Sequence, residues 1–129
     1  MTEGKIKVLV VDDDEFVRLN LLAYLEDEGF SVFSATSGEE ALGLLDHQEV
    51  DVAAVDMRLP GMDGNTFILK AHQARPGTRF VVYTGSINYN LPESLKAVGV
   101  RTEHVFLKPV EDMEILRRAI EAAARDRKP

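Results

Sequence analysis

An apolar run passes directly into acidic residues in the stretch VLVVDDDE, residues 8–15. The unbroken apolar residues Val8 to Val11 are typical of a strand that is buried on both faces of a parallel sheet. The run stops at Asp12 and Asp13, so their carboxylates are expected at the carboxyl end of that strand. Open α/β sheets bind their ligands at this edge.

Short apolar runs and amphipathic segments alternate along the rest of the chain. This alternation predicts βα units that build a parallel sheet with helices on both faces. The expected strands are 6–11, 30–35, 50–55, 79–83 and 104–107, and the expected helices are 14–28, 38–46, 65–74, 93–98 and 111–125. The predicted fold class is α/β, a doubly wound (βα)5 sheet of the flavodoxin type with strand order 2-1-3-4-5.

Local signals define the ends of several segments. Gly29 follows the first helical segment as a C-cap residue, and Ser37 with Glu40 forms an S-x-x-E capping box that begins the second. A loop rich in breakers, residues 59–64, follows Asp56 and places that aspartate at a strand end. Between residues 87 and 103, asparagine, proline and glycine leave room only for a short helix.

Length and composition indicate a single globular domain. The chain has 129 residues, of which 45% are hydrophobic and 29% charged, and these are ordinary globular values. We expect one domain over residues 1–129, with 126–129 as a frayed tail. The absence of cysteine excludes disulfides and thiolate chemistry.

Charge and hydropathy narrow the classes of partner. The formal net charge of −7 repels phosphate backbones and anionic lipids, so direct binding to nucleic acid or membranes is not expected. No apolar run approaches the ~20 residues of a membrane span, and the N-terminus lacks the features of a signal peptide. A cytoplasmic location is the expectation.

Polar residues stand at the ends of four predicted strands. Asp12 and Asp13 follow the first, and Asp56, Thr84 and Lys108 follow the third, fourth and fifth. In the order 2-1-3-4-5 these strands are neighbours, so their polar side chains converge on one edge of the sheet. Clustered carboxylates repel one another unless a cation lies among them, and oxygen ligands favour Mg²⁺ or Mn²⁺.

This combination of groups suits phosphoryl transfer. A metal ion, the Lys108 ammonium and the Thr84 hydroxyl would all face one carboxylate, that of Asp56. Catalysis of phosphoryl transfer consists mostly of positioning and of stabilising charge on the phosphoryl oxygens. Asp56 is therefore the expected acceptor nucleophile.

Four segments together resemble the receiver domains of two-component signalling. They are VLVVDD (8–13), VDMRLPGMDG (55–64), YTG (83–85) and LKP (107–109), and the resemblance covers essentially the whole chain. Each motif alone is weak, whereas all four at the right strand ends are specific. The resemblance implies a phosphorylation switch that is not an enzyme beyond its own phosphorylation and autodephosphorylation. It implies a phosphohistidine donor on a sensor kinase or a phosphotransfer protein.

The resemblance also assigns roles at the acidic edge. Asp13 would bind Mg²⁺ directly, Asp12 partly through water, and the backbone carbonyl of Arg58 would be a further ligand beside Asp56. Lys108 would contact the phosphoryl oxygens. The bond between Lys108 and the following proline would be cis, which an X-Pro bond allows at modest cost.

The switch departs from the family pattern. Thr84 would move to bond the phosphoryl group, while Arg58 and Ser86 would tune its lifetime. Receivers commonly carry Tyr or Phe three residues before the lysine, and Val105 stands there instead. Phe106 is expected on the opposite face of the sheet because side chains alternate along a strand.

Only the resemblance to receiver domains indicates where partners would bind. Kinase docking is expected near the first helix, and a homodimer or output contact near the fourth helix, fifth strand and fifth helix. The chain is either a stand-alone receiver or part of a longer regulator or hybrid kinase.

Other interpretations remain open. Asp12 to Asp14 can be a solvated turn with Asp14 as a helix N-cap, and Thr84 and Lys108 can lack a role. A phosphatase of the haloacid dehalogenase kind needs a D-x-D motif in a catalytic context that is absent here. A flavodoxin-like cofactor site needs a phosphate-binding loop where this chain has acids. An interaction module that is never phosphorylated is the third alternative.

Overall fold

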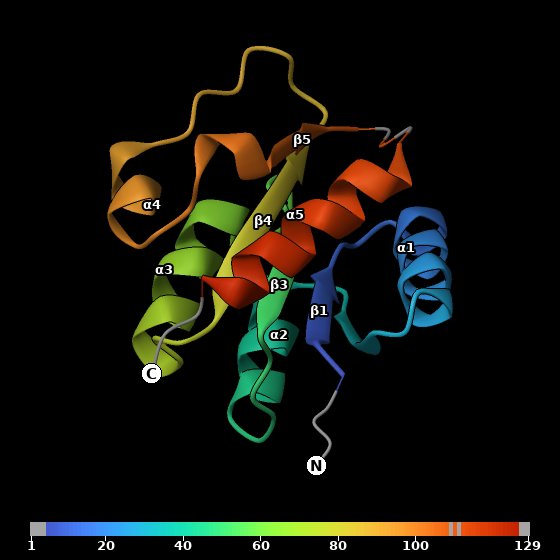
Figure 1. Ribbon diagram of the computed structural model, residues 1–129. Coiled ribbons are helices and arrows are strands. Elements are labelled where there is room, and N and C mark those ends of the chain that lie inside the picture. Colours follow the sequence, from blue (N-terminus) through green and yellow to red (C-terminus); the bar gives the residue numbers. More distant parts are fainter. Residues whose placement is uncertain (1–4, 109, 111, 127–129) are drawn as a thin grey trace.

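The computed structural model describes residues 5–108, 110 and 112–126. Strands and helices alternate along the chain (Figure 1), and their bounds are β1 Lys7–Val11, α1 Glu15–Asp27, β2 Ser31–Ala35, α2 Gly38–Leu45, β3 Val52–Asp56, α3 Gly64–Ala74, β4 Arg79–Thr84, α4 Glu93–Ala97, the 3-10 helix η1 Thr102–His104, β5 Val105–Leu107 and α5 Met113–Arg125.

The strands form one five-stranded sheet in the order β2-β1-β3-β4-β5. All neighbouring strands are parallel. The predicted (βα)5 fold and strand order are confirmed. Because β1 and β3 are neighbours, Val11 is in register with Val55, and the residues that follow each strand reach the same edge.

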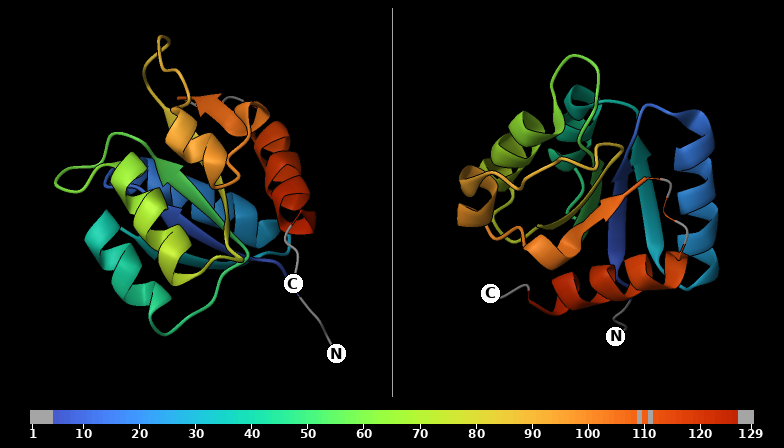
Figure 2. Two further views of the ribbon diagram at one scale, coloured as in Figure 1. Left: turned by 90° about the vertical axis from the view of Figure 1, so that its left-hand side faces the viewer. Right: turned by 90° about the horizontal axis from the view of Figure 1, so that it is seen from above.

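Helices cover both faces of the sheet, as the view from above in Figure 2 shows. One core lies between the sheet and α2, α3 and α4, and it includes Leu45, Phe67 and Leu95. The other lies between the sheet and α1 and α5, and it includes Leu25 and Ile120. The central strands β1 and β3 contribute to both cores, which explains why their apolar runs are unbroken.

Side-chain caps fix where the helices begin. Asp14, Ser37, Asp63 and Asp112 each accept a hydrogen bond from a backbone N–H in the first turn of the following helix. The predicted capping box of α2 is present, since the backbone N–H of Glu40 donates to Ser37 Oγ at 3.0 Å. Gly29 has a φ of 96°, the left-handed conformation expected just after α1.

Several predicted boundaries were wrong by one or two residues. β3 begins at Val52 and includes Asp56, and β4 extends to Thr84. The predicted strand 104–107 begins one residue late because residues 102–104 form the 3-10 helix η1. α5 begins at Met113, after its N-cap Asp112.

The C-terminal end of α5 is described as far as Asp126. Asp126 is the C-cap residue of α5, and its Oδ2 lies 3.2 Å from Nη1 of Arg101. The remainder of the predicted frayed tail, 127–129, lies outside the described residues. Over the part of the chain that the structure describes, no helix combines the length and apolar character needed to cross a membrane.

Candidate functional site

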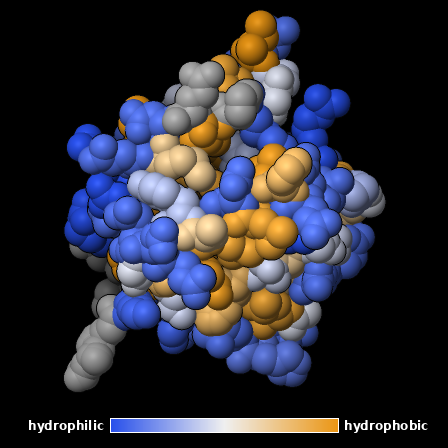
Figure 3. Space-filling model, turned by 90° about the vertical axis from the view of Figure 1, so that its right-hand side faces the viewer, coloured by the Kyte–Doolittle hydropathy of each residue, from blue (hydrophilic) through white to orange (hydrophobic). Residues whose placement is uncertain are grey.

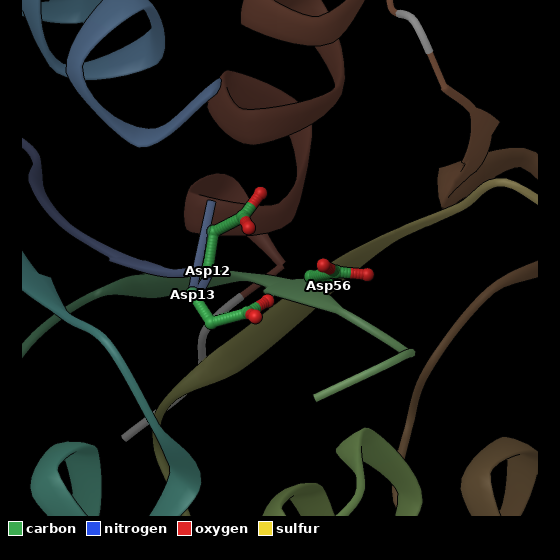
Figure 4. A group of neighbouring side chains, drawn as sticks. All are labelled: Asp12, Asp13 and Asp56. Atoms are coloured by element: carbon green, nitrogen blue, oxygen red, sulfur yellow. The ribbon is translucent and has the colours of Figure 1, made fainter. Parts of the chain in front are cut away.

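Three carboxylates meet at the carboxyl edge of the sheet. Asp12 and Asp13 follow β1, and Asp56 is the last residue of β3 (Figure 4). One carboxylate oxygen from each lies within 4.8 Å of the others. The cluster predicted from the strand ends is therefore present.

Asp12 is fully buried, and both of its carboxylate oxygens have hydrogen-bond partners. The backbone N–H of Asp14 donates to Oδ1 at 2.8 Å, and the hydroxyl of Tyr83 donates to Oδ2 at 2.9 Å. Burial raises the pKa of the Asp12 carboxyl above its ordinary value, while these two hydrogen bonds oppose the rise. Because burial makes ionisation of Asp12 costly, a nearby cation would help to keep this carboxylate ionised.

Asp56 is buried and is held by groups from two other segments. The backbone N–H of Arg58 donates to Oδ1 at 3.0 Å, and Nζ of Lys108 lies 3.2 Å from Oδ2. The same Nζ lies 3.8 Å from Oδ2 of Asp12. Lys108 is thus brought to the carboxylate cluster, closer to Asp56 than to Asp12.

The loop after β3 packs tightly against the strand end. Asp63 caps α3 by accepting from the backbone N–H of Thr66 at 2.8 Å. A Cβ on Gly64 would lie 2.8 Å from Cα of Met57 and 3.1 Å from the carbonyl oxygen of Asp56. Glycine is needed here because another backbone approaches so closely, and this contact sets the course of the chain after Asp56.

Thr84 is buried at the end of β4, and its hydroxyl is turned to its own loop. Its Oγ1 accepts a hydrogen bond from the backbone N–H of Ser86 at 3.2 Å. Ser86 Oγ in turn accepts from the backbone N–H of Asn88 at 3.3 Å. Both hydrogen bonds lie within the loop between β4 and α4.

Val105 and Phe106 lie on opposite faces of β5, as strand alternation predicted. Val105 packs on the core of α2, α3 and α4, and Phe106 on the core of α1 and α5. Phe106 is therefore not a substitute for the missing aromatic at position 105. The predicted cis bond after Lys108 involves a residue outside the described ones.

The donor set at the edge fits Mg²⁺ or Mn²⁺. It consists of carboxylate oxygens, the ligands that hard divalent cations prefer, and the oxygens cluster within 4.8 Å. Asp13 is exposed, so solvent can reach the cluster and complete a coordination sphere with water.

Sequence patterns missed two residues that contact the acidic cluster. Tyr83 reads as a core aromatic in a strand, yet its hydroxyl bonds Asp12. Arg18, one turn into α1, donates from Nη1 to the backbone carbonyl of Asp12 at 3.0 Å. Tyr83 lies directly before a predicted site residue at a strand end, and that position was the only available signal for it.

Known proteins are similar to this chain in sequence and in structure. Residues 8–121 match the family model of the response regulator receiver domain. Sporulation initiation phosphotransferase F of Bacillus subtilis is 29% identical over 109 residues, which cover 84% of this chain and 86% of that protein. A cyclic di-GMP phosphodiesterase of Thermotoga maritima is 36% identical over 120 residues, 93% of this chain and 31% of that protein.

Solved structures agree with the family match. A CheY-like receiver domain of Methanospirillum hungatei has a TM-score of 0.79 and 28% identity, with 95% of this chain and 96% of that chain covered. A receiver domain of Clostridium thermocellum has a TM-score of 0.81 and 25% identity, with 94% and 95% covered.

Several curated relatives are much longer than this chain. The alignment spans 31% of the phosphodiesterase and 28% of the transcriptional regulatory protein GlrR of Escherichia coli. With its parallel sheet, its acidic edge and the family match over residues 8–121, the chain belongs to the response regulator receiver domain family.

Proposed function

We propose that this receiver domain accepts a phosphoryl group on Asp56 from a phosphohistidine of a sensor kinase or phosphotransfer protein. The observation that carries the proposal is the convergence of Lys108 and two further carboxylates on Asp56. Asp12, Asp13 and Asp56, with the backbone carbonyl of Arg58, would hold Mg²⁺ or Mn²⁺.

In the transfer step, a carboxylate oxygen of Asp56 forms a bond to phosphorus. The bond from phosphorus to the donor imidazole nitrogen breaks, and its electron pair leaves with that nitrogen. Lys108 shifts its ammonium from the Asp56 carboxylate toward the phosphoryl oxygens, where it offsets their charge. Mg²⁺, when bound, supplies further positive charge against the repulsion between the carboxylate and the incoming phosphoryl group.

The response would start at Thr84. Its hydroxyl can exchange the backbone N–H of Ser86 for an oxygen of the phosphoryl group, and this exchange would move the β4–α4 loop. Arg58 and Ser86 flank the site and would tune how long the phosphoryl group survives. Val105 is too small to repeat the usual aromatic movement, so loop movement at Thr84 and Ser86 would carry more of the signal.

Two surfaces are proposed for partners. Phe16 and Leu19 on α1 are exposed apolar residues, and they suit docking of the phosphodonor. Figure 3 views the molecule from the side on which α1 lies in Figure 1, and hydrophobic side chains gather on that face. Leu107 on β5 is half exposed on the region of α4, β5 and α5, where a homodimer or output contact is proposed. The net charge of −7 supports a domain that does not bind nucleic acid or membranes directly.

The proposal also covers the domain organisation and the location of the protein. Residues 1–129 would act as one domain in the cytoplasm, whether alone or within a longer regulator. The domain would serve as a phosphoacceptor, with no turnover of a substrate beyond its own phosphorylation and dephosphorylation.

Mass spectrometry of intact protein after incubation with acetyl phosphate and Mg²⁺ tests the proposal. Wild type should gain the mass of one phosphoryl group, and Asp56→Ala should gain none. Asp51→Ala is a matched control, because Asp51 directly precedes the opposite end of β3, and this variant should be phosphorylated like wild type. Phosphorylation of Asp56→Ala to the wild-type extent, or none in wild type, would reject Asp56 as the acceptor. An unmodified wild type that also shows no NMR response to beryllium fluoride would favour the interaction module.

A further inference from the structure

Tyr83 joins the apolar core to the acidic cluster. It is fully buried between the sheet and the helices α1 and α5, and its hydroxyl donates to Oδ2 of Asp12 at 2.9 Å. Burial, together with the charge of Asp12, raises the pKa of Tyr83 well above its ordinary value, so the hydroxyl keeps its proton. Phenylalanine would fill this core equally well, and packing alone therefore does not account for the hydroxyl.

Asp12 and Asp56 both lie within reach of one ammonium group. Nζ of Lys108 is 3.2 Å from Oδ2 of Asp56 and 3.8 Å from Oδ2 of Asp12. The same Nζ lies 5.6 Å from the centre of the Tyr83 ring. The oxygen of Asp12 that is nearest to Lys108 is the one that accepts the Tyr83 hydrogen bond.

The Tyr83 hydroxyl and the Lys108 ammonium both approach Oδ2 of Asp12, and the hydroxyl is the closer of the two. A buried carboxylate that loses a donor turns to the nearest remaining one, because an uncompensated buried charge is costly. Nζ of Lys108 lies 3.8 Å from Oδ2 of Asp12, so without the hydroxyl the ammonium group would move in to form a direct ion pair at about 2.8 Å. That pair would draw Lys108 away from Asp56 and neutralise Asp12 with an ammonium group instead of a metal ion.

We propose that Tyr83 is a positioning residue of the acidic site. Its hydroxyl satisfies Asp12 with a neutral donor, which leaves Asp12 available to a divalent cation and Lys108 available to Asp56. The benefit to phosphoryl transfer rests on the proposed function of Asp56. The effect on cation binding does not require any phosphoryl transfer.

Calorimetric titration of the unphosphorylated protein with Mg²⁺ tests the effect of Tyr83 on cation binding. Tyr83→Phe should bind Mg²⁺ about tenfold more weakly than wild type, the lower end of the effect of losing a group that orients a metal ligand. Tyr24→Phe is the matched control, because its hydroxyl bonds Arg117 between α1 and α5, away from the carboxylates. Wild-type affinity in Tyr83→Phe would overturn the proposal.

A double-mutant cycle with Lys108 separates competition from simple loss of packing. In a Lys108→Met background no ammonium competes for Asp12, so adding Tyr83→Phe should change Mg²⁺ affinity by less than about twofold. An equal loss in both backgrounds would overturn the proposal, since Tyr83 would then act without Lys108. Should Asp56 prove not to be phosphorylated in wild type, the proposed function would fail while this binding cycle would still give its result.

Discussion

Nζ of Lys108 lies 3.2 Å from Oδ2 of Asp56, although 52 residues separate them in the chain. The pair lies at the carboxyl edge of the sheet. Lys108 keeps 23% of its side-chain surface exposed, whereas Asp56 keeps 3%. The lysine can therefore meet an incoming anion without unfolding any element.

Replacement of Lys108 by alanine should slow phosphorylation of Asp56 by about a hundredfold, the effect of removing one preorganised charge donor. The rate of phosphoryl incorporation from acetyl phosphate, followed by mass spectrometry, measures it. Lys96→Ala is the control, because Lys96 pairs with Glu93 on the exposed surface of α4. Similar rates in Lys108→Ala and wild type would contradict the role of Lys108.

Replacement of Asp12 by asparagine should stabilise the protein at neutral pH by about 1 kcal/mol or more, because it removes a buried charge. Burial raises the pKa of folded Asp12 above the ordinary 3.8, so the folded state binds a proton before the unfolded state does. The Asp12 contribution to the free energy of unfolding therefore grows as the pH falls through the folded pKa toward 3.8.

Urea unfolding of both proteins at several pH values measures this dependence. The advantage of Asp12→Asn over wild type should shrink as the pH falls. Mg²⁺ at a hundred times its dissociation constant should raise the free energy of unfolding of wild type by about 2.7 kcal/mol. The increase should be smaller in Asp12→Asn. An advantage that grows at acid pH would contradict the pKa direction.

Replacement of Gly64 by alanine should destabilise the protein by about 1–3 kcal/mol, because the new methyl group would meet the Met57 backbone at 2.8 Å. Gly43→Ala in α2 is the matched control. A Cβ there has no neighbour within 4 Å, so alanine should stabilise the helix by about 0.5–1 kcal/mol. Thermal and urea unfolding would show shifts of opposite sign.

His104 should make stability fall at mildly acid pH. Burial, followed by the nearby charge of Arg101, lowers the pKa of His104 below its ordinary 6.5. His104 therefore binds a proton more readily in the unfolded state than in the folded state. The free energy of unfolding falls as the pH drops through 6.5 toward the folded pKa. Urea unfolding at about pH 7.5 and 5.5 should show a smaller loss in His104→Gln than in wild type.

The chain sequence by itself determined the order of elements and the acidic edge. The run from Val8 to Val11 and the caps at Asp14 and Ser37 act through neighbouring residues, so their meaning does not depend on distant contacts. Once the strands are parallel and ordered, residues at their carboxyl ends must meet. Asp12, Asp56 and Lys108 were found in this way.

Tertiary structure alone decided which polar atoms pair at that edge. Tyr83 and Asp12 are 71 residues apart, and nothing in an alternating strand pattern separates a core tyrosine from one whose hydroxyl reaches a carboxylate. The 3-10 turn that delays β5 to Val105 was also hidden from the sequence pattern. Periodicity encodes which face a side chain takes, whereas the pairing of single atoms depends on strand register, on side-chain rotamers and on the depth of burial.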